Sequence, residues 1–186
     1  GDGSIAEMCG NGVRAFVEYL RTEGLIELEV GETVKIGTRA GVKTVARTEE
    51  GYAIDMGPWS FIHGDAAREG GEDCLVSARG LKTPRAGLSI SMGNPHTVVM
   101  LGSDGKLDGL DLHSLPQVNP APVNGTNVEF VVPVDLDVES GAHVGAIRMR
   151  VHERGVGETL SCGTGACAAA AATRFWGGEE APDEWL

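Results

Sequence analysis

Two of the four cysteines stand in closely similar surroundings. Cys9 is followed by Gly10-Asn11-Gly12, and Cys162 by Gly163-Thr164-Gly165. Each motif leads into a predicted helix, so each thiol faces unpaired N–H groups and the positive end of the helix dipole. That setting favours a thiolate and can lower a thiol pKa from about 8.5. The glycines allow unusual backbone angles and the close approach of a ligand, so the same N–H groups could hold a substrate carboxylate.

A pair of such sites indicates acid–base chemistry at a carbon stereocentre. Inversion requires one group to remove a proton from one face and another to return a proton to the opposite face. At any instant one sulfur must be a thiolate and the other a thiol. General acid–base catalysis works best when the pKa values of the two groups lie near the operating pH. We therefore predict that Cys9 and Cys162 are the catalytic pair of a two-base racemase or epimerase.

The two motifs belong to an imperfect internal repeat. A second echo relates residues 55–58 (Asp-Met-Gly-Pro) to residues 91–95 (Ser-Met-Gly-Asn-Pro). The cysteines lie 153 positions apart (162 − 9) in a chain of 186 residues, so the repeating unit exceeds half of the chain. If the two units are alike, both are incomplete. We expect a fragment that lacks N-terminal and C-terminal segments, with an incomplete first domain over residues 1–60 and a second domain over residues 61–186.

The elements that must position the cysteines follow from hydrophobic periodicity. Val13, Phe16, Val17 and Leu20 have helical spacing after Cys9, and Gly24 can end that helix. A last helix is predicted from Cys162 through the alanines of residues 166–172. Strands are predicted over residues 25–30, 33–37, 42–47, 52–56, 88–92, 97–101, 128–134 and 142–151. Residues 107–125 are expected to form a loop around at most one short helical turn, and residues 58–84 give no clear pattern. Because the strands are short and linked by turns, we expect antiparallel sheet in an α/β (α+β) fold.

The motifs also allow other interpretations. Both copies match the relaxed dinucleotide fingerprint Gly-x-Gly-x-x-Ala, and Glu29 follows Gly10 at the expected spacing. Neither copy, however, opens a clear parallel strand–helix–strand unit. The glycines could simply make tight helix entries. Four cysteines could form two structural disulfides, and oxidation could join Cys9 to Cys162.

The cysteines outside the motifs have simpler interpretations. Cys74 lies outside any motif and is expected to be inert. Cys167 is expected to pack within the last helix. Its closeness to Cys162 leaves redox pairing between these two thiols open.

Composition narrows the class of protein. The formal net charge is −12, and no basic patch stands out to meet phosphates, so nucleic-acid binding is disfavoured. No run of about 18 apolar residues indicates a membrane span. No charged segment followed by an apolar run indicates a signal peptide, so we expect a cytoplasmic protein. No cysteine and histidine spacing typical of a metal site is present.

Beyond single motifs, the chain resembles the diaminopimelate epimerase family. The resemblance rests on residues 2–4 (Asp-Gly-Ser), 7–14 (Glu-Met-Cys-Gly-Asn-Gly-Val-Arg), 93–96 (Gly-Asn-Pro-His), Asn127 ahead of Phe130, 153–159 (Glu-Arg-Gly-Val-Gly-Glu-Thr) and 162–166 (Cys-Gly-Thr-Gly-Ala). These motifs occur in the family's order. The related proline racemases carry His after the first Cys-Gly, where this chain has Asn11.

The resemblance implies a fold, a reaction and a site. The fold would be two pseudo-symmetric domains, each a mostly antiparallel, barrel-like sheet around a central helix. The reaction would interconvert L,L- and meso-diaminopimelate for lysine and peptidoglycan precursors, without pyridoxal phosphate or metal, in an enzyme that could be a homodimer. Proton transfer would fall to Cys9 and Cys162. Substrate binding would fall to Gly10, Asn11, Asn94, Asn127, Glu153, Arg154, Gly163 and Thr164, and tuning of the cysteine pair to His96 and Glu153.

Several of these residues have an alternative role. His96 could be a turn residue satisfied by backbone groups, and Asn127 a turn former. Because Glu153 and Arg154 adjoin on a predicted strand, they should point to opposite faces, and one could be a surface charge. Arg14 is expected to be a solvated helix residue. At the level of function, the alternatives are a proline racemase-like or phenazine-pathway-like isomerase, or an inactive fragment or binding protein. Family N-terminal strands with further substrate contacts are expected to be missing.

Overall fold

The structure, a computed structural model, describes residues 8–134 and 143–186. The chain divides into two compact units, with the boundary between Pro58 and Trp59. None of the helices in the described residues is long and apolar enough to span a membrane.

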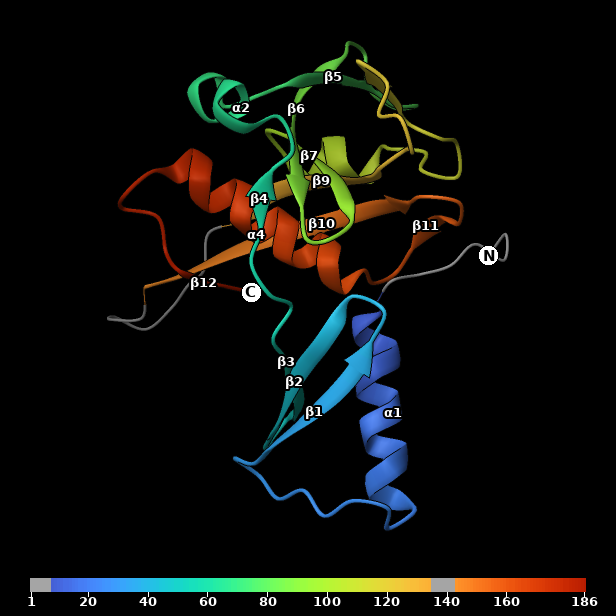
Figure 1. Ribbon diagram of the computed structural model, residues 1–186. Coiled ribbons are helices and arrows are strands. Elements are labelled where there is room, and N and C mark those ends of the chain that lie inside the picture. Colours follow the sequence, from blue (N-terminus) through green and yellow to red (C-terminus); the bar gives the residue numbers. More distant parts are fainter. Residues whose placement is uncertain (1–7, 135–142) are drawn as a thin grey trace. The chain divides into compact units, whose positions relative to one another are not determined.

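The first unit, residues 8–58, packs one helix on a small sheet (Figure 1). Helix α1 (Gly10–Thr22) is followed by β1 (Thr33–Thr38), β2 (Gly41–Thr48) and β3 (Gly51–Ile54), which form an antiparallel sheet in that order. One apolar cluster joins the helix and the sheet; its buried members are Val13, Val17, Leu28, Ile36 and Val45. The predicted helix face is confirmed except at Phe16, which is half exposed.

The predicted strand over residues 25–30 is wrong, because its backbone groups serve the end of α1 instead. Gly24 adopts a φ of +66°, and its N–H donates to the Arg21 carbonyl oxygen, while the Leu25 N–H reaches back to the Leu20 carbonyl. This pattern of bonds is a Schellman motif. Farther along, the Glu32 carboxylate accepts the N–H of Glu29 at 2.7 Å. The apolar side chains here, such as the buried Leu28, pack on the helix without strand pairing.

The second unit, from Trp59 to Leu186, is built on one curled sheet. Its elements are β4 (Ser60–Phe61), α2 (Gly64–Gly70), β5 (Cys74–Ser77), β6 (Arg85–Ser91), β7 (Pro95–Met100), α3 (Asp104–Asp108), β8 (Gln117–Asn119), β9 (Asn127–Val134), β10 (Val144–Glu153), β11 (Gly157–Thr159), α4 (Gly163–Gly177) and β12 (Glu184–Trp185). The strand order is β11-β10-β9-β7-β6-β5-β8, with β4 paired to β6 and β12 paired to β10.

Most strand pairs of this sheet are antiparallel, as expected, but two pairs are parallel, so the sheet is mixed. Strands β7 and β9 run parallel, with His96 opposite Asn127, and β12 runs parallel to β10. Parallel neighbours need a long crossover. Residues 101–126 supply it, and they contain α3 and the unpredicted strand β8. The predicted strands in β6, β7, β9 and β10 are confirmed within a few residues, although residue 142 lies outside the described residues.

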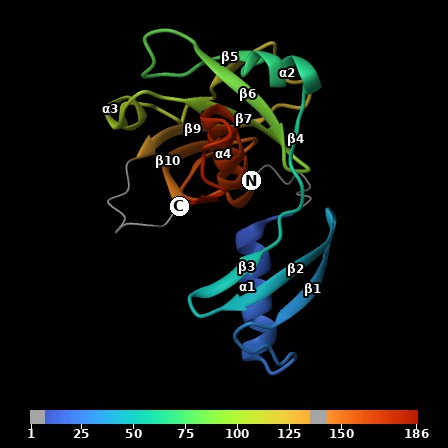
Figure 2. The same ribbon diagram turned by 90° about the vertical axis from the view of Figure 1, so that its left-hand side faces the viewer.

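The strands of this sheet bury side chains on both faces. Helix α4 contacts β6, β7, β9 and β10 on one face, and the curled sheet wraps around it (Figure 2). Because side chains alternate along a strand, His96 and Glu129 share the face of α4, whereas Thr97 and Phe130 take the opposite face. The opposite face carries the larger apolar cluster, whose buried members are Cys74, Val76, Val99, Leu101, Leu107, Leu110, Leu112, Val128, Phe130 and Val132. The small side chains of Ala168, Ala169 and Ala172, all fully buried, let α4 lie close to the sheet.

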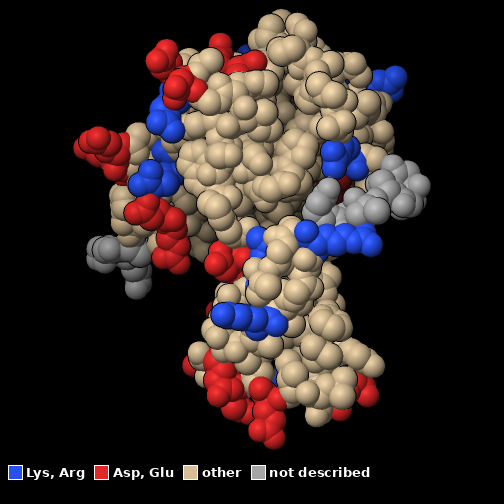
Figure 3. Space-filling view, in the orientation of Figure 1, with Lys and Arg blue, Asp and Glu red and all other residues tan. Residues whose placement is uncertain are grey.

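Charged side chains on the molecular surface reflect the net charge of −12. Figure 3 shows acidic side chains gathered at the end of the first unit where α1 stops. The exposed residues Glu23, Glu27, Glu29 and Glu32 belong to the segment after that helix. Over the second unit, the basic side chains on this face are scattered and do not form one basic patch (Figure 3).

Truncation of the Phe130 side chain tests the core of the second unit. Phe130 is completely buried, so Phe130→Ala should lower the free energy of unfolding by about 3–5 kcal/mol. The matched control, Leu160→Ala, removes a fully exposed side chain and should change it by less than about 0.5 kcal/mol. All three tryptophans, Trp59, Trp176 and Trp185, belong to this unit, so urea unfolding followed by tryptophan fluorescence reports on it. Equal effects of the two substitutions would contradict the described core.

Candidate functional site

The two predicted cysteine sites have nearly identical backbones. Cys9 is the N-cap of α1 with φ −132° and ψ 112°, and Cys162 is the N-cap of α4 with φ −130° and ψ 108°. Their carbonyl oxygens accept the first helical hydrogen bonds, from the Val13 N–H at 2.9 Å and the Ala166 N–H at 2.8 Å. Each sulfur therefore lies at a helix start, as the sequence predicts.

The second glycine of each motif lies beneath the sulfur. The Gly12 N–H donates to Sγ of Cys9 at 3.4 Å, and a Cβ at position 12 would lie 3.5 Å from that sulfur. At position 165 a Cβ would lie 3.2 Å from Sγ of Cys162 and 2.7 Å from Oε1 of Glu129. Only the second copy is thus so crowded that a side chain at the glycine would displace its neighbours.

The second sequence echo forms the same turn twice. Gly57 and Gly93 have φ values of +84° and +89°. The Gly57 N–H donates to the Asp55 carboxylate at 2.8 Å, and the Gly93 N–H donates to Oγ of Ser91 at 3.2 Å. The repeat seen in the sequence is therefore a repeat of local structure.

A chain of polar contacts leads from the sheet to Cys162. Nδ2 of Asn94 donates to Oγ1 of Thr164 at 3.3 Å, and that hydroxyl lies 3.7 Å from Sγ of Cys162. On its other side, Oδ1 of Asn94 lies 3.1 Å from Nε2 of His96. His96 is completely buried and bonded to side chains, so it is not the turn residue of the alternative interpretation.

Asn127 and Arg154 are joined at the end of the β7–β9 pair. The buried Asn127 side chain accepts the Arg154 N–H at 2.9 Å and donates to the Pro95 carbonyl at 3.1 Å. Both Oδ1 and Nδ2 of Asn127 are therefore hydrogen-bonded to backbone groups, and the side chain holds the turn at Arg154 in place. Arg154 follows the end of β10, and its guanidinium donates to the Asn124 carbonyl at 3.1 Å. Glu153, the last residue of β10, accepts a hydrogen bond from the Thr159 hydroxyl.

Burial changes the expected acidity of Cys162. Desolvation raises the pKa of this thiol to about 11, and the nearby carboxyl groups of Glu153 and Glu129 act in the same direction. The Gly165 N–H and the Thr164 hydroxyl lower it, but by less. The expectation of a lowered pKa is wrong for Cys162, because the helix-start argument leaves out the cost of burying a charge.

The other predicted residues, Cys9, Gly10 and Asn11, belong to the first unit. Cys9 and Asn11 are exposed, and Gly10 is buried. Arg14 is exposed on the helix, as expected, and its Nε also donates to the Tyr52 carbonyl at 3.1 Å. A further bond at 3.4 Å runs from Arg14 to Oδ1 of Asn11.

No disulfide joins any of the four cysteines, all of which are among the described residues. The interpretation as two structural disulfides is therefore wrong for this structure. Cys74 is buried beside Ser89, and desolvation raises the pKa of its thiol to about 12, in agreement with the expected inertness.

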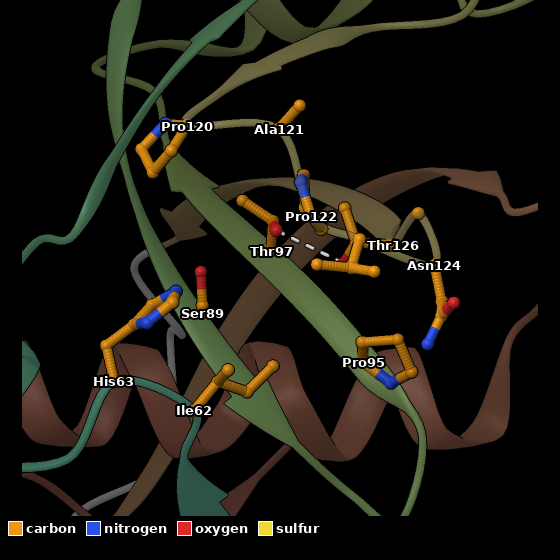
Figure 4. A pocket seen from close by; sticks show the side chains of 12 residues that line it. Ile62, His63, Ser89, Pro95, Thr97, Pro120, Ala121, Pro122, Asn124 and Thr126 are labelled. Carbon is orange, nitrogen blue, oxygen red and sulfur yellow. Dashed lines mark hydrogen bonds between the residues drawn. The ribbon is translucent and has the colours of Figure 1, made fainter.

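A cavity of about 330 Å³ lies on the sheet face opposite α4 (Figure 4). It is lined by Ile62, His63, Ser89, Pro95, Thr97, Pro120, Ala121, Pro122, Val123, Asn124, Gly125 and Thr126. None of the predicted site residues lines it. Among the labelled side chains, Thr97 and Thr126 are hydrogen-bonded to each other at 3.1 Å.

Sequence reasoning missed Glu129. This residue is completely buried on β9, and its Oε1 lies 2.7 Å from Nδ1 of His96. Burial raises the pKa of its carboxyl group. The only sequence signal is an acidic residue in an otherwise apolar strand, two residues after Asn127, where it shares the face of α4.

Comparison with known proteins identifies relatives of the chain. The profile of the diaminopimelate epimerase family matches residues 1–62 and 88–183, leaving out the stretch that contains α2 and β5. A diaminopimelate epimerase of Rhodococcus erythropolis is 40% identical over 182 residues, which cover 96% of this chain and 56% of the relative. One of Mycobacterium tuberculosis is 41% identical over 176 residues, covering 92% and 54%. The chain thus spans about half the length of these curated relatives.

A solved structure shows a similar fold. The crystal structure of a Bacillus anthracis phenazine biosynthesis protein of the PhzF family matches with a TM-score of 0.52. The alignment covers 93% of this chain and 58% of the other, at 14% sequence identity. At that identity the likeness concerns the fold alone.

The two glycines beneath the sulfurs provide a matched pair of substitutions. Gly165→Ala should lower the free energy of unfolding by about 1–3 kcal/mol, because the new Cβ would meet Oε1 of Glu129 at 2.7 Å. Gly12→Ala meets only ordinary contacts and gains helix propensity, so stability should rise by up to about 1 kcal/mol. Calorimetry of both variants measures the difference. Equal changes would show that the second copy is no more tightly packed than the first.

The raised pKa of Cys162 predicts a loss of stability at alkaline pH. The folded protein holds the thiol proton up to a pKa of about 11, whereas the ordinary value is 9.0. This contribution to stability is therefore complete below about pH 9 and disappears as the pH rises towards 11. Cys162→Ser should remove this part of the pH dependence in urea unfolding, while the contribution of Cys74 stays in both proteins. Identical pH profiles would show that Cys162 is not desolvated.

Proposed function

Because the chain belongs to the diaminopimelate epimerase family, we propose that it interconverts L,L- and meso-diaminopimelate by a two-base mechanism. Cys9 and Cys162 serve as the two bases, one for each face of the substrate α-carbon. The reaction supplies lysine and peptidoglycan precursors in the cytoplasm. Residues 1–60 belong to an incomplete first epimerase domain, and residues 61–186 belong to the second.

The observation that carries this proposal is the equivalence of the two helix starts. Both cysteines are N-caps with the same backbone angles to within a few degrees, and each has a glycine beneath its sulfur. A two-base inversion needs one acid–base group on each face of the stereocentre. The duplicated Cys-Gly-x-Gly turn provides them, and it supports a two-base reaction over a single-site one.

Proton transfer begins with Cys162 as the acid. Its raised pKa keeps the sulfur protonated in the free protein, so it can donate this proton to the substrate carbon. Cys9 acts as the base that takes the α-proton: the C–H bond breaks and an S–H bond forms on one face. On the other face, the S–H bond of Cys162 breaks and a new C–H bond forms. Exchange of both sulfurs with water restores the starting state, and no cofactor takes part.

The substrate carboxylate binds at the start of α4. The first N–H groups of a helix have no partner within the helix and attract anions, and here they belong to Gly163 and Thr164. Arg154, held by Asn127 and Asn124, presents a guanidinium group that pairs well with a carboxylate. In the first unit, Gly10 and Asn11 play the part of Gly163 and Thr164.

Glu153 and Asn94 complete the proposed site. An ionised Glu153 raises the pKa of Cys162 and can pair with the substrate ammonium group. Asn94 already bridges His96 and Thr164, so it positions the turn that carries the thiol. His96 and Glu153 tune the acidity of the cysteine.

Deuterium exchange tests the reaction in this chain. In D₂O, the α-proton signal of L,L-diaminopimelate should disappear from the proton NMR spectrum as the meso isomer forms. Cys9→Ala and Cys162→Ala should each abolish both changes, because either substitution removes one of the two bases. The matched control, Cys167→Ser, alters the neighbouring thiol on α4 and should leave exchange unchanged.

Three outcomes would contradict the proposal. Full turnover by Cys9→Ala would remove the two-cysteine role. Exchange of the α-proton of proline or of another amino acid in preference to diaminopimelate would favour the related isomerases. No exchange of any substrate by the unsubstituted chain would make it an inactive fragment or a binding protein.

A further inference from the structure

One buried titratable group has no part in the proposed reaction. Glu129, on β9, is completely buried, and its Oε1 lies 2.7 Å from Nδ1 of His96. Its second oxygen, Oε2, has no hydrogen-bond partner among the described residues. A carboxylate in this state would lose the solvation of both oxygens, and its Oε2 would gain no hydrogen bond from the described residues in return. In a neutral carboxylic acid the unpartnered oxygen would be an uncharged carbonyl oxygen, whose burial costs less free energy than that of a charged oxygen.

The direction of the neighbouring hydrogen bonds fixes where protons lie. Asn94 donates through Nδ2 to Thr164, so its Oδ1 is the atom that faces Nε2 of His96. An amide oxygen can only accept, and Nε2 must therefore carry a hydrogen. In a neutral imidazole the other nitrogen, Nδ1, is then an acceptor. With the ring neutral, the donor in the short bond between His96 and Glu129 is the carboxylic acid.

We propose that Glu129 is a positioning residue held as a neutral carboxylic acid, which donates its proton to Nδ1 of His96 and fixes the Nε2–H tautomer of that ring. The ring then holds Asn94, Asn94 holds Thr164, and Thr164 lies against Sγ of Cys162. The position of the first turn of α4 therefore depends on the acid proton of Glu129, a residue of β9.

Packing against α4 supports this assignment. A Cβ at residue 165 would lie 2.7 Å from Oε1 of Glu129, so the glycine leaves room for the acid group under the helix start. The opposite arrangement, a carboxylate with an imidazolium, would separate two charges in a site closed to water. Two other titratable groups interact electrostatically with Glu129: Glu153 on β10 and Cys162 on α4. An ionised Glu129 would oppose a thiolate at Cys162, and the neutral acid does not.

Nitrogen-15 NMR of the histidine rings tests the proton positions in the unsubstituted chain. At neutral pH, His96 should show one protonated nitrogen, Nε2. His152 is the internal reference: it is also buried, but its Nδ1 lies 2.8 Å from the Leu112 carbonyl oxygen, so it must carry its hydrogen on Nδ1. The two buried histidines should therefore display opposite tautomers. A doubly protonated ring or an Nδ1–H tautomer at His96 would overturn the proposal.

Two variants separate the acid from the carboxylate. Glu129→Gln keeps an N–H donor for Nδ1, so the His96 tautomer and the thermal midpoint should stay close to those of the unsubstituted chain. Glu129→Leu removes the donor, so the tautomer should no longer be fixed and the midpoint should fall. In the infrared difference spectrum between the unsubstituted chain and Glu129→Gln, the C=O band of a protonated acid should be lost. Loss of carboxylate bands instead would contradict the proposal.

The effect on catalysis rests on the proposed function, whereas the proton positions do not. If the chain epimerises diaminopimelate, Glu129→Gln should retain more of kcat than Glu129→Leu, with KM little changed in both. An inactive chain with the predicted tautomers would refute the function and leave the assignment of Glu129 intact. An active chain with an imidazolium at His96 would refute the assignment of Glu129 and leave the proposed function intact.

Discussion

The close approach of the first turn of α4 to the sheet is the constraint on which the second unit's site depends. Gly165 lies so near to Oε1 of Glu129 that a Cβ would collide with it. Because of this contact, the first turn of α4 with Cys162 and Thr164 lies over buried polar side chains of β7 and β9. These side chains are hydrogen-bonded to one another. The alanines farther along α4 keep the helix at the same small distance from the sheet. A larger side chain at any of these positions would move Cys162 away from its partners.

The two copies of the motif share a backbone but differ in surroundings. Cys9 is exposed in this structure, whereas Cys162 is buried within the second unit. The same N-cap geometry thus serves two sulfurs with different access to water. Burial raises the pKa of Cys162, so this sulfur retains its proton in the free protein.

Local chemistry made much of the fold predictable, and tertiary packing accounts for what was missed. Both helix starts and the Gly24 helix end were predictable, because glycine and helical spacing act within a few residues. Residues 25–30 were mistaken for a strand, since periodicity does not show that their N–H groups cap α1. The parallel pairing of β7 with β9 and the role of Glu129 depend on partners about 30 residues away along the chain. The raised pKa of Cys162 likewise comes from burial, which no local motif reveals.

We propose that the two cysteines act on one carbon from opposite faces. A crystal structure of the chain with bound diaminopimelate measures this directly. Both sulfurs should lie within about 3.5 Å of the same α-carbon, one on each side of it, as a near-attack geometry requires. A substrate carbon in contact with only Cys162 or only Cys9, or with both sulfurs on one face, would contradict it.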